Sequence, residues 1–263
     1  MRSLLKKLVL ASAMMLCVFN LFADEKGLQI MTEVADFKEP KFTRSQVIMT
    51  IEDANGSQEK RQIIEYGKNQ DGKTYMVMDF KTPASVKGTR FMQITDDNGP
   101  DNKWIYLPSL KSVRRVNSSE GSKSFMGTDA TYDDMASREV SEDEHTFVKE
   151  EHYTVESGVT YDCYVVKSVP NDKKSSQYSY RIVWVDKTSM YPVHTELYDK
   201  AGKLVKVLEV LSIDNIQGYY IPLTDKLTNV QTGHSTSIEI VKIEIDKAIP
   251  ERIFTQNFLS TGK

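Results

Sequence analysis

The sequence predicts a mainly β protein whose antiparallel strands close into a barrel or stack as a sandwich. Apolar and polar residues alternate with period two along most of the chain, and short turns rich in Asn, Asp and Gly separate the alternating stretches. Helical patterns are scarce. Because successive side chains of a strand point to opposite faces, so many amphipathic strands cannot bury their apolar residues as a single flat sheet.

The start of the chain has the pattern of a secretory signal. Arg2, Lys6 and Lys7 make it positively charged, residues 8–22 are almost wholly apolar, and we expect cleavage after Ala23. A membrane-spanning helix needs about 20 apolar residues, and this run is shorter. We therefore expect an exported protein of the periplasm.

Two cysteines bear on the compartment and on anchoring. Cys17 raises the alternative of a lipid anchor, but Leu16 precedes it and an apolar stretch follows it, which both disfavour lipidation. Cys163 alone would remain after cleavage, so we expect no internal disulfide and interpret this residue as a small apolar side chain in a strand.

The mature chain, residues 24–263, has a suitable length for one all-β domain. Loss of the signal shifts its net charge from −3 to about −6. Clustered Lys and Arg are needed to neutralise phosphates, and residues 111–115 form the one notable basic run. We therefore expect no nucleic-acid partner.

Thirteen strands are expected, joined mainly by tight turns that make neighbours antiparallel. In order, they cover residues 43–53, 58–68, 73–81, 88–96, 102–107, 112–117, 144–156, 159–169, 178–187, 191–199, 203–214, 219–231 and 235–246. Two short helices are expected, one over residues 28–37 and one over 250–258, where Pro250 suits a first helical position.

Several strands carry apolar residues on both faces. In the strand 102–107, Ile105 and Leu107 alternate with Trp104 and Tyr106. This pattern indicates that one face packs against a helix or loop while the other lines a core or a cavity. Periodicity leaves open whether that interior is filled or hollow.

Residues 117–137 interrupt the alternation. A polar stretch comes first, and Phe125 and Met126 follow it. A loop of this length in a compact domain is typically functional or mobile. We expect the two apolar residues to cover an apolar interior, either as a lid or as a local staple.

The order of several motifs resembles the outer membrane lipoprotein-sorting protein family. The matching segments are Gly88–Phe91, Asp101–Val116, Ser124–Asp129, Tyr132–Asp134, Gly218–Pro222 and Ile249–Phe254 with Leu259. This family is similar to periplasmic lipoprotein carriers of the LolA and LolB type. The resemblance implies a half-open antiparallel β-barrel with a few covering helices and a lid loop, whose hydrophobic cavity shields acyl chains.

The resemblance also implies partners and a site. Partners would be lipidated proteins or phospholipid acyl chains, an inner-membrane transporter and an outer-membrane acceptor. From the alternation of side chains along the strands, we predict that the lipid-binding cavity and lid are formed by Phe91, Trp104, Tyr106, Phe125 and Met126. The opposite parity, with Ile105 and Leu107 facing the cavity, stays open.

Two alternatives are a lipid-acting enzyme and a non-lipid envelope adaptor with a packed core. The sequence has no G-x-S-x-G elbow and no zinc motif, and its histidines are scattered over positions 145, 152, 194 and 234. Acidic groups at 96–101 and at 129–134 could bind Ca²⁺, but turn chemistry explains the first of them. We therefore expect no catalytic residues, no resident metal and no cofactor.

Overall fold

The computed structural model describes residues 24–96, 99–136, 138–174 and 176–263. The expected secretory signal, its cleavage after Ala23 and the alternative anchor at Cys17 lie outside these residues. The chain forms two compact units, one containing Glu139–Lys203 with the N-terminal residues up to Phe37, and the other containing Lys38–Arg138 and Leu204–Lys263. The expectation of one domain over residues 24–263 stays a prediction.

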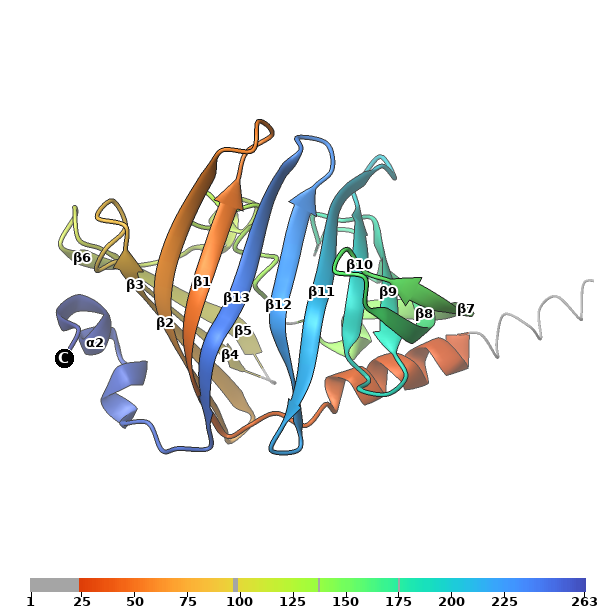
Figure 1. Cartoon of the computed structure of the whole chain (residues 1–263), viewed down its shortest axis with the longest axis horizontal. Coiled ribbons are helices and arrows are strands. Elements are labelled where there is room, and N and C mark those ends of the chain that lie inside the picture. Colours follow the sequence, from red (N-terminus) through yellow and green to blue (C-terminus); the bar gives the residue numbers. More distant parts are fainter. Residues whose placement is uncertain (1–23, 97–98, 137, 175) are drawn as a thin grey trace, which may run out of the picture. The chain divides into compact units, whose positions relative to one another are not determined.

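The larger unit is an antiparallel sheet with the strand order β6-β5-β4-β3-β2-β1-β13-β12-β11. Its strands are β1 (Phe42–Glu52), β2 (Gln58–Gln70), β3 (Lys73–Thr82), β4 (Arg90–Asp96), β5 (Gly99–Leu107), β6 (Ser112–Arg115), β11 (Leu204–Ile216), β12 (Tyr219–Asn229) and β13 (His234–Ile245). In Figure 1, β4 and β5 pass behind β2, β1 and β13, so the sheet curls. The strand order does not return to β6, which has β5 as its one neighbour, so the sheet stays open.

One face of this sheet, called here the inner face, carries a hydrophobic core, the inner cluster. Buried side chains from five strands, β1 to β5, pack with the loop that follows β6, which includes a short 3-10 helix, Ser118–Glu120. These are Val47, Met49, Ile63, Phe80, Val86, Phe91, Ile105, Val116, Phe125 and Tyr132. The loop expected at 117–137 therefore lies on the inner face and contributes two of its aromatic rings.

The C-terminal segment covers the opposite, outer face. A 3-10 helix, Glu251–Phe254, and α2, Gln256–Thr261, pack against strands β2 to β6, with Leu259 fully buried. The single helix expected over 250–258 is thus divided at Thr255, whose backbone is extended and whose Oγ1 accepts a hydrogen bond from the Phe258 N–H at 3.2 Å. The same hydroxyl donates to the Arg252 carbonyl oxygen at 2.7 Å, so Thr255 contacts the end of the first helix and the start of the second.

The smaller unit is an antiparallel sheet with the order β10-β9-β8-β7. Its strands are β7 (Asp143–Thr154), β8 (Thr160–Pro170), β9 (Tyr180–Asp186) and β10 (Pro192–Tyr198), and a 3-10 helix, Val140–Glu142, precedes β7. A helix over residues 24–35 packs Ile30 against Val166 and Val183. Gly27 lets this helix approach β7, because a Cβ there would lie 2.6 Å from the Phe147 nitrogen.

All thirteen expected strands are present in the described part of the chain, and the N-terminal helix begins four residues earlier than expected. Cys163 lies buried in β8, where burial raises the pKa of its thiol to about 12. This environment agrees with its interpretation as a small apolar residue. None of the helices in the described ranges is long and apolar enough to cross a membrane.

Candidate functional site

Three of the five nominated residues meet on the inner face. The rings of Phe91 and Phe125 lie with centroids 4.9 Å apart in an edge-on arrangement, and Phe125 packs edge-on against Tyr132 at 5.6 Å. Met126 is partly buried against the same cluster. Its backbone carbonyl accepts a hydrogen bond from Arg61 Nη1 at 2.7 Å. The loop is therefore held to β2 next to its apolar residues.

The other two nominated residues, Trp104 and Tyr106, lie on the outer face. Phe91 is directly opposite Ile105 in the β4–β5 pair, so the neighbours of Ile105 point the other way. Trp104 and Tyr106 pack in the outer cluster with the C-terminal segment. Grouping them with Phe91 was wrong, because the sequence does not give the register of β4 against β5. The alternative parity places Ile105 and Leu107 correctly on the inner face.

The inner face also has a partly exposed apolar surface that sequence reasoning did not find. Partly buried apolar side chains from β1, β3, β5, β13 and the loop surround the inner cluster. They are Ile51, Met76, Met78, Leu107, Met126, Met135, Ile238 and Ile240. Four of the eight are methionines, whose flexible side chains adapt to irregular shapes. The alternation of apolar residues in β3 and β13 indicated that these side chains share a face. The pairing register is needed to show that this face is the inner one.

Ion pairs and hydrogen bonds hold the loop to three strands of the sheet. In addition to the Arg61 contact with β2, Lys206 Nζ of β11 lies 2.6 Å from Asp134 Oδ2, with both side chains nearly buried. The Asp129 N–H donates to Thr236 Oγ1 of β13 at 3.0 Å, and that hydroxyl donates to Asp129 Oδ2 at 2.8 Å. Asp129 and Asp134, from the second acidic group considered for Ca²⁺, thus hold the loop in place.

Two carboxyl groups lie on the inner face among apolar side chains. Glu65 of β2 is opposite Ser45 and Met78, and Asp225 of β12 is opposite Ile238 and Val210. Burial raises the pKa of Glu65 to about 7. Burial, and secondarily the charge of Glu65, raises the pKa of Asp225 to about 7. Both residues are of intermediate exposure.

These two carboxyl groups should make stability fall as pH rises. In the folded protein both carboxyl groups keep their protons up to a pKa of about 7. In the unfolded chain Glu65 and Asp225 lose them near pH 4.5 and 3.8. The free energy of unfolding therefore falls as pH rises from about 4 to 7. We expect Glu65→Gln to raise the free energy of unfolding near pH 8 by roughly 1–3 kcal/mol, with little change near pH 4. Urea unfolding at both pH values measures this, and equal effects at both would contradict it.

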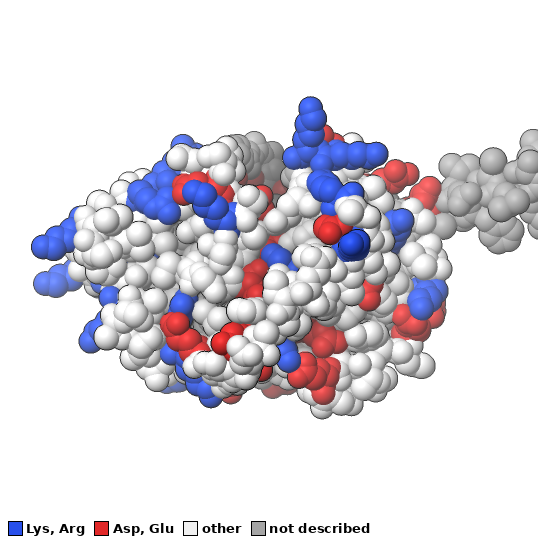
Figure 2. All heavy atoms as spheres, turned by 90° about the horizontal axis from the view of Figure 1, so that it is seen from above, with Lys and Arg blue, Asp and Glu red and all other residues white. Residues whose placement is uncertain are grey.

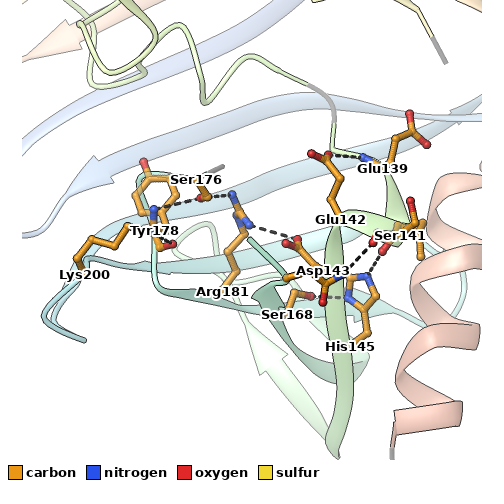
Figure 3. A network of polar contacts seen from close by, with 12 residues as sticks. Glu139, Ser141, Glu142, Asp143, His145, Ser168, Ser176, Tyr178, Arg181 and Lys200 are labelled. Atoms are coloured by element: carbon orange, nitrogen blue, oxygen red, sulfur yellow. Dashed lines mark hydrogen bonds and ion pairs between the residues drawn. The ribbon is translucent and has the colours of Figure 1, made fainter. Parts of the chain in front are cut away.

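Two of the four histidines, His145 and His194, are buried in structural contacts. In Figure 3, His145 lies beside Ser168, with Nδ1 2.8 Å from Ser168 Oγ and Nε2 2.9 Å from the Val140 carbonyl oxygen. This carbonyl can only accept, so Nε2–H donates to it and Nδ1 accepts from the serine. His145 is 5% and Ser168 2% exposed, so this pair lies beneath the surface of the smaller unit.

The same network secures the entry to β7. Arg181 Nη1 lies 3.4 Å from Asp143 Oδ2, and its Nη2 donates to Ser176 Oγ at 3.2 Å (Figure 3). The His194 ring packs against the rings of Tyr153 and Trp184, with centroid distances of 4.2 and 4.7 Å. Within the described ranges, no three His, Cys, Asp or Glu side chains gather as metal ligands.

Charges of both signs are interspersed on the face of the molecule in Figure 2. The basic run at 111–115 is partly neutralised, because Arg114 Nη1 lies 2.9 Å from Glu120 Oε2. A phosphate-binding surface needs uncompensated cations along a path. The expectation from composition that nucleic acid is not the partner stays a prediction.

Solved structures resemble this chain over nearly its whole length. An outer membrane lipoprotein-sorting protein domain from Vibrio parahaemolyticus has 30% sequence identity and a TM-score of 0.82, with 90% of this chain and 99% of that chain covered. A DUF1329 family protein from Desulfovibrio piger has 25% identity and a TM-score of 0.82, with the same coverage. A LolA superfamily protein from Nitrosomonas europaea, at 16% identity and a TM-score of 0.64, shares the fold over 88% of this chain and 98% of its own.

A model of a related family, described as an uncharacterized protein, matches residues 72–261. None of the curated proteins matches the chain. The open, mainly antiparallel sheet and these similarities define the class as a half-open, LolA-like β protein. The chain belongs to the outer membrane lipoprotein-sorting protein family, which confirms the resemblance in its sequence motifs.

Proposed function

We propose that the protein is a periplasmic carrier or acceptor that binds acyl chains of lipoproteins or lipids and moves them towards the outer membrane. The observation that carries the proposal is the inner face of the larger unit, where eight partly buried apolar side chains lie next to a loop secured to the sheet. A family member that handles lipidated cargo would need such a surface, since it must replace the bilayer around the hydrocarbon.

Hydrocarbon burial sets the energy scale of this function. Each buried methylene contributes about 0.8 kcal/mol, so a lipid with two or three chains does not leave a membrane for water without a substitute apolar environment. A carrier must also release its cargo. Methionine side chains at 76, 78, 126 and 135 support both requirements, because they can repack around chains of different shapes without fixed polar contacts.

The loop would act as the movable cover of the bound chains. Phe125 and Met126 pack on the inner face, and the contacts from Arg61, Lys206 and Thr236 are polar and few. Displacement of the loop would exchange these contacts for water and would also expose Phe125, and bound hydrocarbon would offset the second cost by covering the same apolar face. Displacement of the loop would therefore open the inner face to cargo while the strands keep their pairing.

A capture experiment tests the proposal against its alternatives. Delipidated mature protein is incubated with vesicles containing labelled phospholipid or a labelled diacylated lipopeptide, and the protein is then separated from the vesicles. A carrier recovers intact label at close to one cargo molecule per chain. Release of a hydrolysed product would identify a lipid-acting enzyme instead, and absence of both capture and product would favour a non-lipid adaptor.

The proposed partners are tested by transfer. An inner-membrane transporter would load the carrier and an outer-membrane acceptor would receive the cargo. Loaded protein is mixed with inner-membrane or outer-membrane vesicles, and the label on each is followed. Preferential delivery to outer-membrane vesicles supports the proposed direction, and equal delivery to both would contradict it.

A further inference from the structure

We infer that the inner face of the larger unit binds the ammonium group of an amine-bearing amphiphile between Glu65 and Asp225. The inference rests on the proposed function, because the acyl chains of the same molecule would lie on the apolar part of this face. It specifies the chemistry of the cargo's head group, which the apolar surface by itself leaves undefined.

The strand registers bring the two carboxyl groups to the same face. Ile63, Val47 and Ile240 lie directly opposite one another across β2, β1 and β13 and form an apolar row. Glu65 is two residues along β2 from this row, and Asp225 is opposite Ile238, two residues from the row on β13. The carboxyl groups thus flank an apolar strip, and the charge of Glu65 contributes to the raised pKa of Asp225.

Neither carboxyl group has a hydrogen-bond or ion-pair partner among the residues that the structure describes. The cations of the inner face have other partners. Arg61 Nε lies 2.7 Å from Glu59 Oε1, Lys206 pairs with Asp134, and Lys103 Nζ lies 3.2 Å from Asp101 Oδ2. Unpaired ionised carboxylates among methionine and isoleucine side chains are costly, and a ligand cation would remove that cost.

A buried amide on the same face supplies an independent observation. Gln93 of β4 is 5% exposed and lies opposite Met76, next to the Met78 and Phe91 pair. Its Nε2 donates to the Met135 carbonyl oxygen at 2.7 Å and to Asp101 Oδ2 at 3.3 Å, which fixes the amide orientation. Its Oε1 is buried without a donor.

The two carboxyl groups of the inner face therefore lack donors, and the Gln93 carbonyl, on a strand two places away from that of Glu65, is a further acceptor of this face without a donor. Buried acceptors are normally satisfied, and an unsatisfied one points to a missing donor. A primary ammonium group carries three N–H donors and a positive charge. An amine-bearing head group thus fits this site better than a hydroxyl, which has one donor, or a carboxylate, which would be repelled.

The test compares three long-chain probes that differ only in the head group: an alkylamine, the matching alcohol and the matching fatty acid. The delipidated mature protein is expected to bind the amine about tenfold more tightly than the alcohol near pH 8, and the fatty acid most weakly. Glu65→Gln and Asp225→Asn should each remove most of the preference for the amine. Both variants should leave alcohol binding unchanged or stronger.

Glu239→Gln is the matched control, because Glu239 is exposed on β13 and points to the outer face. Its preference for the amine should equal that of the unaltered protein. Equal affinity for amine and alcohol, or a preference that survives both inner-face substitutions, would overturn the inference while leaving lipid binding intact. Failure of all three probes to bind would overturn the proposed function as well.

The pH profile of binding provides a second readout. The residues directly opposite the two carboxyl groups are Ser45, Met78, Ile238 and Val210, which do not titrate, and the other charged groups named on this face are Arg61, Lys103 and Lys206 with their ion-pair partners. Amine binding should strengthen as pH rises through 7, because the carboxyls become ionised, and alcohol binding should weaken. A parallel change of both would contradict the inference.

The ammonium group could come from an aminophospholipid or from a lysine of a lipidated protein, and two pairs of ligands distinguish these sources. Phosphatidylethanolamine is compared with phosphatidylglycerol, and a diacylated peptide containing lysine is compared with the same peptide containing norleucine. A preference within the first pair alone identifies an aminophospholipid, and a preference within the second pair alone identifies the side chain of a lipidated protein. No preference in either pair would count against an ammonium site for natural cargo.

Discussion

Replacement of Phe125 with alanine is expected to lower the free energy of unfolding by about 3–5 kcal/mol, as for other large buried aromatic residues. Phe125 is 2% exposed and contacts the rings of Phe80, Phe91 and Tyr132. Truncation would leave a cavity in the centre of the inner cluster and weaken the attachment of the loop. Guanidinium unfolding curves measure the change.

Leu110→Ala is the control for this prediction, because Leu110 is 61% exposed at the turn between β5 and β6. Its expected effect is within about 0.5 kcal/mol. If both variants were equally stable, the loop would not be part of the core, and Phe125 would be a surface residue of a mobile lid. If the prediction holds, opening of the lid must carry the cost of exposing this ring.

Replacement of Ile240 with glutamate is expected to lower lipid capture at least tenfold. Ile240 is partly buried on the inner face, directly opposite Val47, and borders the surface proposed for acyl chains. An additional carboxyl group there would have to lose its hydration for hydrocarbon to bind, and this cost exceeds the roughly 1.4 kcal/mol that corresponds to a tenfold change. Capture of labelled phospholipid by the delipidated protein measures the effect.

Ser237→Glu provides the matched control on the same strand. Ser237 is opposite Thr50 and Lys226, on the face that points away from Ile238. The new carboxylate would lie in water near a lysine and should leave capture within about twofold of the unaltered protein. Circular dichroism establishes that both variants fold. Equal capture by the two variants would place the acyl chains elsewhere than on the inner face.

The sequence was sufficient to predict all thirteen strands, because alternation and turn residues are local signals. It could not provide the register between strands. Trp104 and Tyr106 alternate with Ile105 and Leu107, and both sets are apolar, so hydrophobicity alone could not decide which set faces inwards. In the structure both faces of β5 are covered. The C-terminal helices pack against Trp104 and Tyr106 on the outer face, and the inner cluster covers Ile105.

The polar part of the candidate site was beyond sequence reasoning for the same reason. Glu65 is flanked by Ile64 and Tyr66 and looks like an ordinary outward-facing residue of an amphipathic strand. Its position on the inner face becomes evident only from its pairing with Met78. Asp225 similarly follows Thr224 and precedes Lys226 in a polar stretch of β12. Neither residue has a local motif that indicates an unpaired carboxyl group.

The motifs that carried the family resemblance have structural roles in the described chain. Trp104 and Tyr106 anchor the C-terminal segment, and Arg90 donates through Nη1 to the Leu259 carbonyl oxygen at 2.8 Å on the same face. Phe125 fills the inner cluster. The matching motifs thus reflect how the fold holds its helices and its loop. This explains why they identified the family correctly but identified the residues of the inner face only in part.

The central claim is that acyl chains bind on the inner face of the larger unit, and photo-crosslinking tests it most directly. A phospholipid with a diazirine at the middle of one acyl chain is loaded onto the protein and activated, and the modified residues are identified by mass spectrometry. We predict adducts at Met78, Met126 and Ile238. Adducts confined to Trp104 and Tyr106 on the outer face, or none on the larger unit, would contradict the claim.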